Sequence, residues 1–241
     1  GFKHDICSAV HPTAVSSPFL RTLPLEQYGV EWVHPELPLV HPLPDGDAVV
    51  ISKSLDETLD GLGKDADAYR KLYKPFIKGW LSLAEDLFAP FNLFPGNPFK
   101  MARFGYYGLR SARKFADNLF QEDRTKAMFG GLAAHSIIPL TYPGSAAFGL
   151  VLGSSLHAVG WPFAKGGSAT ITHAMAEYFK SLGGVIETSR RITDRSEVKD
   201  YPAVLFNTSP RTMVEIMGDA LPERYRHKIE DYKYGPGVFK I

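Results

Sequence analysis

Eight histidines are the side chains of this sequence with the widest choice of chemistry. His34 and His41 lie seven residues apart in the extended stretch VHPELPLVHP, and no cysteine pair accompanies them. Zinc and iron sites group histidine, cysteine and carboxylate ligands closely, so we predict no metal site. His135 and His157 lie in an uncharged stretch. Each could line a substrate pocket or be a hydrogen-bonded core residue.

Two glycine motifs could bind phosphate. GLGKDA at Gly61–Ala66 matches G-x-G-x-x-A, but the polar, helix-like SLDETLD precedes it where a dinucleotide fingerprint needs a strand. We interpret it as a glycine turn followed by Asp65 as a helix N-cap. Gly166 and Gly167 precede a predicted helix and could face an anion, although a tight loop is the simpler interpretation. The sequence contains neither a P-loop motif nor a G-x-S-x-G nucleophile elbow.

A basic cluster without an acidic residue is the third candidate. It consists of Lys100, Arg103, Arg110, Arg113 and Lys114. We interpret it as a solvated helix face in preference to a membrane or nucleic-acid contact. The formal net charge of the chain is only +1, which gives no global reason to expect nucleic acid as a partner.

Composition places these residues in a globular protein. The chain has 241 residues and is 44% hydrophobic and 22% charged, which suits one large domain or two small ones. Its one cysteine, Cys7, excludes an internal disulfide and fits a reducing compartment. The opening GFKHDICSAV lacks the apolar segment of a secretory signal. We predict a cytoplasmic protein and leave peripheral membrane contact open.

The first two thirds of the chain predict extended segments followed by helices. Prolines, including three His-Pro pairs, favour extended backbone and turns before residue 50, with a strand in GDAVVIS. Apolar residues recur at helical spacing over 65–88, with a kink at Pro75, and further helices are predicted over 98–120 and 122–135. Residues 127–164 carry no charge, but their prolines and glycines favour a buried core helix or cavity wall over a membrane span.

The last third alternates helix and strand signals. A helix is predicted over 170–182, ended by Gly183 and Gly184, and another over 210–218. VIETS (185–189) and AVLFNTSP (203–210) have the composition of strands. This rhythm favours an α/β fold, or a mixed α+β fold.

Three stretches carry a resemblance to a known family. GWPFAKGGSATITHAMAEYFKSLGGVIETSRRIT (160–193) resembles a block of the phytoene-desaturase-like (phytoene dehydrogenase-related) FAD-dependent oxidoreductases. GFKHDICSAVHP is similar to the family stretch G-F-x-x-D, and LFNTSPRTM resembles its strand that ends in a T-x-P turn. The resemblance extends over nearly the whole chain.

The resemblance implies part of a Rossmann-like FAD-binding domain with a largely helical substrate domain. Residues 1–60 would border the flavin, 61–160 form the substrate domain, and 161–241 return to the FAD-binding domain. The chain would be a central fragment that lacks the N-terminal dinucleotide-binding motif and the C-terminal flavin segment. Losing the phosphate contacts costs about 5 kcal/mol, so this fragment would bind FAD weakly or not at all.

The resemblance also assigns candidate site residues. The predicted FAD contacts are Ser8, Ile192, Thr208, Ser209 and Pro210. The predicted substrate contacts are His11 and Trp161, to which the uncharged stretch adds His135 and His157. No catalytic acid or base is predicted. The implied function is oxidation of an apolar small molecule by hydride transfer to FAD. The alternative is a non-catalytic module that binds an apolar ligand or another protein and has lost the cofactor-binding ends.

Overall fold

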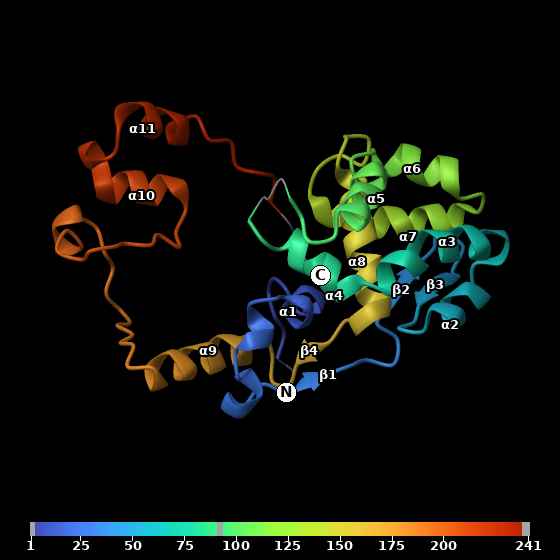
Figure 1. Cartoon of the computed structure of the whole chain (residues 1–241), viewed down its shortest axis with the longest axis horizontal. Coiled ribbons are helices and arrows are strands. Elements are labelled where there is room, and N and C mark those ends of the chain that lie inside the picture. Colours follow the sequence, from blue (N-terminus) through green and yellow to red (C-terminus); the bar gives the residue numbers. More distant parts are fainter. Residues whose placement is uncertain (1–2, 91–93, 238–241) are drawn as a thin grey trace. The chain divides into compact units, whose positions relative to one another are not determined.

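The computed structural model describes residues 3–90 and 94–237, and the chain divides at Gly183 and Gly184 into two compact units (Figure 1). Unit 1 contains the residues up to Gly183, and unit 2 begins at Gly184. About 53% of the chain is helical and the strands are few and short. The fold is therefore mixed α/β, and the described residues contain no Rossmann-like sheet.

Unit 1 contains both small sheets of the described chain. β2 (Leu39–Pro42) and β3 (Ala48–Ile51) form an antiparallel hairpin, in which β3 is the strand predicted in GDAVVIS and β2 was not predicted. Its turn uses Gly46 at φ 86°, a backbone angle that glycine adopts without strain. β1 (Trp32–Val33) pairs antiparallel with β4 (Phe163–Ala164), and so joins segments that are distant in sequence.

Helices form the rest of both units. In unit 1 they are α1 (Pro12–Ser16), α2 (Leu55–Asp60), α3 (Ala66–Ile77), α4 (Trp80–Leu87), α5 (Pro98–Gly108), α6 (Ala112–Leu119), α7 (Asp123–Ala133), α8 (Ser145–Val159) and α9 (Ala169–Ser181). In unit 2 they are α10 (Pro210–Met217) and α11 (Glu223–Glu230). Single 3-10 turns lie at Leu20–Thr22, Leu25–Tyr28, Gly63–Asp65, Ala134–Ser136, Arg195–Glu197 and Gly218–Ala220.

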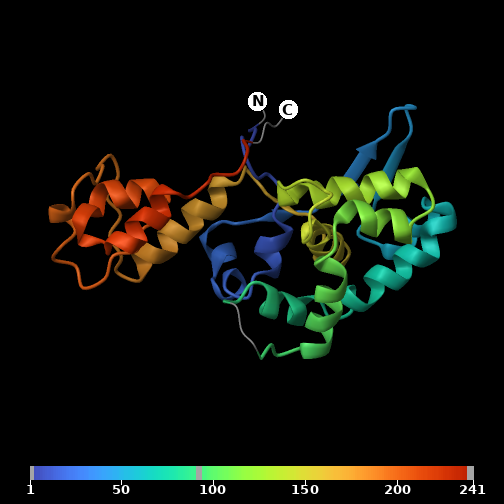
Figure 2. The same cartoon turned by 90° about the horizontal axis from the view of Figure 1, so that it is seen from above.

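Helix α8 lies in the core of unit 1, where it contacts α3, α5, α6 and α7 (Figures 1 and 2). Two glycines allow aromatic rings to approach it closely. A Cβ at Gly149 would lie 2.8 Å from the Phe129 ring, and one at Gly153 would lie 2.5 Å from Tyr73. Tyr73 also donates a 3.0 Å hydrogen bond to the carbonyl oxygen of Gly149. The prediction of a buried core helix is confirmed, and none of the described helices is long and apolar enough to cross a membrane.

This close packing predicts that Gly153→Ala destabilises the protein by about 1–3 kcal/mol, because the new methyl group would overlap the Tyr73 ring. Gly105→Ala on α5 is the matched control, since a Cβ there meets no atom within 4 Å. It should stabilise the protein by about 0.5–1 kcal/mol through helix propensity. Urea unfolding measures both changes, and shifts of the same sign would contradict the packing argument.

The predicted helix over 65–88 is interrupted at Lys78 and Gly79, between α3 and α4. Pro75 lies inside α3 and has no N–H to donate to the carbonyl of Lys71. The Nη2 atom of Arg103, on α5, donates to that carbonyl oxygen at 3.3 Å. A side chain from a neighbouring helix therefore replaces the bond that proline removes.

The prediction of one helix over 98–120 is wrong, because α5 and α6 are separate. The Ser111 hydroxyl accepts from the N–H of Lys114 at 3.2 Å and caps α6. The hydroxyl of Ser145 accepts from Ala112 N–H at 2.8 Å, and the N–H groups of Gly144 and Ala146 donate to the Arg110 carbonyl. The start of α8 thus satisfies the backbone groups that the break exposes.

The GLGKDA motif forms a turn, but Asp65 does not cap the helix predicted for it. Asp65 occupies the N-cap position of α3 without a capping hydrogen bond from its side chain. Its buried carboxylate accepts from the N–H groups of Gln121 and Glu122 at 2.7 and 2.8 Å. Asp65 therefore stabilises the segment that enters α7, more than fifty residues away in sequence.

The two strands predicted in unit 2 are absent. Residues 185–189 and 203–208 form no ladder with any described strand, and a strand without a partner leaves its backbone groups unpaired. Unit 2 instead contains α10, the unpredicted α11 and a capping box between Asp194 and Glu197.

Residues 12–28, where we predicted extended backbone, contain α1 and two 3-10 turns. Helix α1 forms there because Pro12 suits the first position of a helix.

Candidate functional site

Two sequence motifs of unit 1 meet at the start of α9, and we name this contact the Ser168 junction. It consists of Asp5, Ser8, His11 and Ser168. The hydroxyl of Ser168 donates to the carbonyl oxygen of Ser8 at 2.7 Å and lies 2.8 Å from Nε2 of His11. The backbone N–H of Ser168 lies 3.0 and 3.1 Å from the two carboxylate oxygens of Asp5. The stretches DICSAVH and GGS thus form one hydrogen-bonded structure.

Backbone contacts and a strand pair position the junction. The N–H of His11 donates to the carbonyl of Pro162 at 2.8 Å, just before β4 pairs with β1. Gly166 and Gly167 then turn the chain into α9 with φ angles of 86° and 97°. These left-handed angles explain why two glycines precede the helix. A Cβ at Gly167 would also lie 3.5 Å from the Asp5 carboxylate.

Hydrogen bonding and burial define what the junction can do chemically. A serine hydroxyl has one hydrogen, which Ser168 gives to Ser8, so Nε2 of His11 donates to the Ser168 oxygen. Burial lowers the pKa of His11, and the Asp5 charge partly opposes this shift. The arrangement lacks the serine-to-histidine hydrogen bond that activates a hydrolase nucleophile. It suits a rigid wall of a binding site.

Trp161 lies one residue before Pro162 and is 4% exposed. Its indole N–H is buried and has no hydrogen-bond partner among the described residues. The ring of His135 lies edge-on with its centroid 6.3 Å from that of Trp161. His135 itself is exposed, with Nδ1 3.3 Å from the carbonyls of Gly131 and Leu132. The structure thus brings two predicted substrate residues together and leaves one donor unsatisfied.

His157 lies elsewhere, in the core against α3. Its Nε2 is 2.9 Å from the hydroxyl of Tyr69, and its Nδ1 is 3.3 Å from the carbonyl of Lys53. Burial lowers the pKa of His157 to about 4, while hydrogen bonds to backbone act in the opposite direction. Burial likewise raises the pKa of Tyr69. His157 therefore has the surroundings of a neutral core histidine, the other role that the sequence allowed.

The remaining predicted FAD contacts belong to unit 2. The Ser209 hydroxyl accepts from the N–H of Thr212 at 3.2 Å and caps α10, with Pro210 as its first residue. Thr208 is exposed beside them. Ile192 lines a separate cavity of about 270 Å³ together with charged side chains, among them Arg190. Residues 208–210 thus lie together at the N-terminus of α10, whereas Ile192 lines the 270 Å³ cavity.

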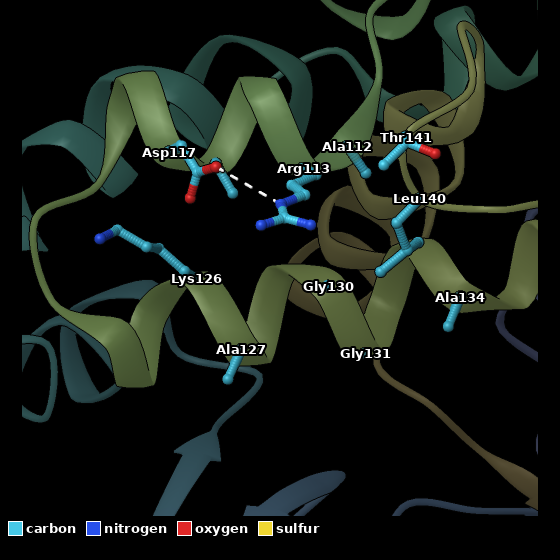
Figure 3. A pocket seen from close by; sticks show the side chains of 11 residues that line it. Ala112, Arg113, Asp117, Lys126, Ala127, Gly130, Gly131, Ala134, Leu140 and Thr141 are labelled. Carbon is cyan, nitrogen blue, oxygen red and sulfur yellow. Dashed lines mark ion pairs between the residues drawn. The ribbon is translucent and has the colours of Figure 1, made fainter.

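A cavity of about 580 Å³ lies between α6, α7 and the loop after α7, a volume within the usual range of ligand sites (Figure 3). Alanines of α6 and α7 and the glycines of α7 form much of its lining. Figure 3 shows Asp117 and Lys126 at one end and Leu140 and Thr141 at the other. No predicted site residue lines this cavity.

Comparisons with protein-family models, with curated proteins and with solved structures found no match. The resemblance described above therefore stays a prediction. Among the residues that the structure describes, no group of three or more histidine, cysteine, aspartate or glutamate side chains could hold a metal ion.

Sequence reasoning did not select Asp5 or Ser168 as site residues. Each carries a sequence signal that could have identified it. Asp5 is the acidic residue of the G-F-x-x-D stretch. Ser168 follows a glycine pair at the start of a predicted helix, where a serine commonly bonds to backbone.

Proposed function

We propose that this protein takes part in flavin-dependent oxidation of an apolar small molecule, and that the Ser168 junction forms part of the wall beside the flavin ring. The observation that carries the proposal is the junction itself. The two stretches with the clearest resemblance, around Asp5–His11 and Gly160–Thr170, are joined by hydrogen bonds although more than 150 residues separate them. The resemblance alone did not require this contact.

The residues present offer FAD a partial fit. The indole N–H of Trp161 is a buried donor that needs an acceptor, and Ser8 and His11 place polar groups next to the same segment. Ser8 and His11 would lie beside the flavin ring. When bound, FAD accepts a hydride from a C–H bond of the substrate.

The chain's own residues would bind and orient the substrate and would exclude water from it. His11, whose pKa burial lowers, is neutral at pH 7 and donates through Nε2 to Ser168. It thereby holds the wall in place and adds no charge beside an apolar substrate. The buried face of Trp161 would cover the substrate side and keep water from it.

Lumiflavin tests this proposal, because it carries the flavin ring without ribityl phosphate and needs no phosphate-binding loop. Titration of the protein into lumiflavin should quench its fluorescence saturably. Ser168→Ala should weaken binding about two- to tenfold, since it removes the hydrogen bonds that hold Ser8 and His11. Thr172→Ala, an exposed change on the same helix, is the control and should leave binding unchanged.

Absence of lumiflavin binding by the unmodified chain would contradict the proposal, as would equal binding by the two variants.

The 580 Å³ cavity favours the second candidate, a non-catalytic module for an apolar ligand. In that case 1-anilinonaphthalene-8-sulfonate should bind, lumiflavin should not compete with it, and Leu140→Ser should weaken dye binding, because Leu140 lines the cavity.

A further inference from the structure

The cavity between α6 and α7 combines an apolar wall with charged side chains. Figure 3 shows Leu140 at one end, Asp117 and Lys126 at the other, and Arg113 reaching into the space between the two helices. Arg113 belongs to α6 and Lys126 to α7, so each helix contributes one cation to the same cavity. A few charged groups beside an apolar wall are typical of sites that fix the orientation of a small molecule.

The guanidinium of Arg113 has hydrogen-bond donors to spare. It forms an ion pair with Asp117, but Nε and Oδ2 are 3.9 Å apart, which is too long for a hydrogen bond. Its side chain donates no hydrogen bond to any residue that the structure describes. The planar fork of a guanidinium matches the two oxygens of a carboxylate. Arg113 can therefore bind a carboxylate ligand without giving up a hydrogen bond that it already makes.

Lys126 adds a second cation, and its carboxylate partner lies outside the cavity. The side chain of Lys126 is 28% exposed, and its ammonium donates to Asp123 at 3.1 Å. Asp123 is 99% exposed and does not line the cavity, so water weakens this ion pair. The lining itself carries two cations, Arg113 and Lys126, and one anion, Asp117. This balance favours an anionic ligand over a cationic one.

The loop after α7 is held in place as a wall of this cavity. The carbonyl oxygen of Leu140 accepts from the backbone N–H of Arg113 at 3.0 Å, and the N–H of Tyr142 donates to the Pro139 carbonyl at 2.8 Å. The loop begins at Ile137, whose φ of 56° lies in the left-handed region, where a β-branched residue is strained. The hydrogen bonds hold the loop in this costly conformation, so the apolar wall is present before a ligand binds.

We propose that the cavity binds a small amphipathic carboxylate. The carboxylate group would contact the guanidinium of Arg113 and the ammonium of Lys126, and the apolar body would lie against Leu140 and the alanines of α6 and α7. A primary amine would meet two cations, and a neutral alcohol would offer Arg113 no charged partner. The inference rests on the second candidate function for the cavity itself. It is independent of the flavin proposal, because no residue of the Ser168 junction lines this cavity.

Equilibrium dialysis with three probes that share one apolar body tests this inference. The probes are 2-naphthoate, 2-naphthylmethanol and 2-naphthylmethylammonium. The carboxylate should bind about tenfold more tightly than the alcohol, and the amine should bind most weakly. Arg113→Gln should weaken 2-naphthoate binding about five- to tenfold and leave 2-naphthylmethanol binding unchanged, because only the carboxylate uses the guanidinium. Leu140→Ala should weaken binding of both probes, because it removes part of the apolar wall.

Lys114→Gln is the matched control, since it removes the same charge from the next residue of α6, which is exposed and lies outside the cavity. It should bind 2-naphthoate like the unmodified chain, and circular dichroism should show all variants folded. Arg113→Gln should leave lumiflavin binding unchanged.

The outcomes separate this inference from the function on which it rests. If the alcohol or the amine binds as tightly as 2-naphthoate, the inference is overturned and the second candidate function stands. If none of the three probes binds, both are overturned. Equal losses of 2-naphthoate affinity in Arg113→Gln and Lys114→Gln also overturn the inference, because they would show that the carboxylate responds to the general charge of α6 and not to the cavity.

Discussion

Asp65→Ala should lower the free energy of unfolding by about 3–5 kcal/mol. The Asp65 carboxylate is 1% exposed and accepts from two backbone N–H groups, those of Gln121 and Glu122. Each such charge-assisted bond contributes about 1.5–3 kcal/mol, and its removal leaves a backbone donor in the interior without a partner. The loss should appear as a shift of the urea midpoint with an unchanged slope.

Asp67→Ala is the matched control for Asp65→Ala. Asp67 lies two residues further along in the first turn of α3, but its side chain is exposed. Its replacement should change stability by no more than about 0.5 kcal/mol. Asp65→Asn should lie between the two, because the amide retains one acceptor oxygen. If Asp65→Ala and Asp67→Ala have equal midpoints, the two hydrogen bonds do not stabilise the fold.

The second large effect is a loss of stability at acid pH through His157. Burial lowers its pKa to about 4 in the folded protein, whereas an unfolded histidine titrates near 6.5. Below pH 6.5 the unfolded chain takes up a proton that the folded chain does not. Stability therefore falls as the pH decreases from 6.5 to 4, by about 3 kcal/mol in total.

Urea unfolding at a series of pH values measures this contribution in the unmodified protein and in His157→Gln. The variant should lack the component of the slope that lies between pH 6.5 and 4, so the two curves converge on acidification. His173→Gln, on the exposed side of α9, should retain that component because it does not touch His157. Curves for the unmodified protein and His157→Gln that stay parallel would show that His157 is charged in the fold.

Local sequence patterns predicted a helix well where the residues that determine its ends and its burial lie within or beside it. The helix α9 runs from Ala169 to Ser181 against a prediction of 170–182, because a glycine pair bounds it at each end. The uncharged stretch around α8 was correctly interpreted as core, since its prolines and glycines exclude a continuous span.

The failures arise where a distant residue decides the local structure. The break between α5 and α6 depends on Ser145, whose hydroxyl accepts from Ala112 N–H. No sequence pattern near residue 112 predicts that contact. The strands predicted at 185–189 and 203–210 matched a strand pattern, but a pattern supplies no partner for the backbone. In the same way the sequence suggested Ser8 and His11 as site residues without showing that Ser168 joins them.

The bond between Arg103 and the Lys71 carbonyl has a consequence for how this sequence can diverge. Pro75 creates the unpaired carbonyl, and Arg103 satisfies it from another helix. A descendant that replaced Pro75 by alanine would restore the helix bond and release Arg103 from this role. One that lost the arginine first would keep an unsatisfied carbonyl. Positions 75 and 103 should therefore covary, with the proline changing before the arginine.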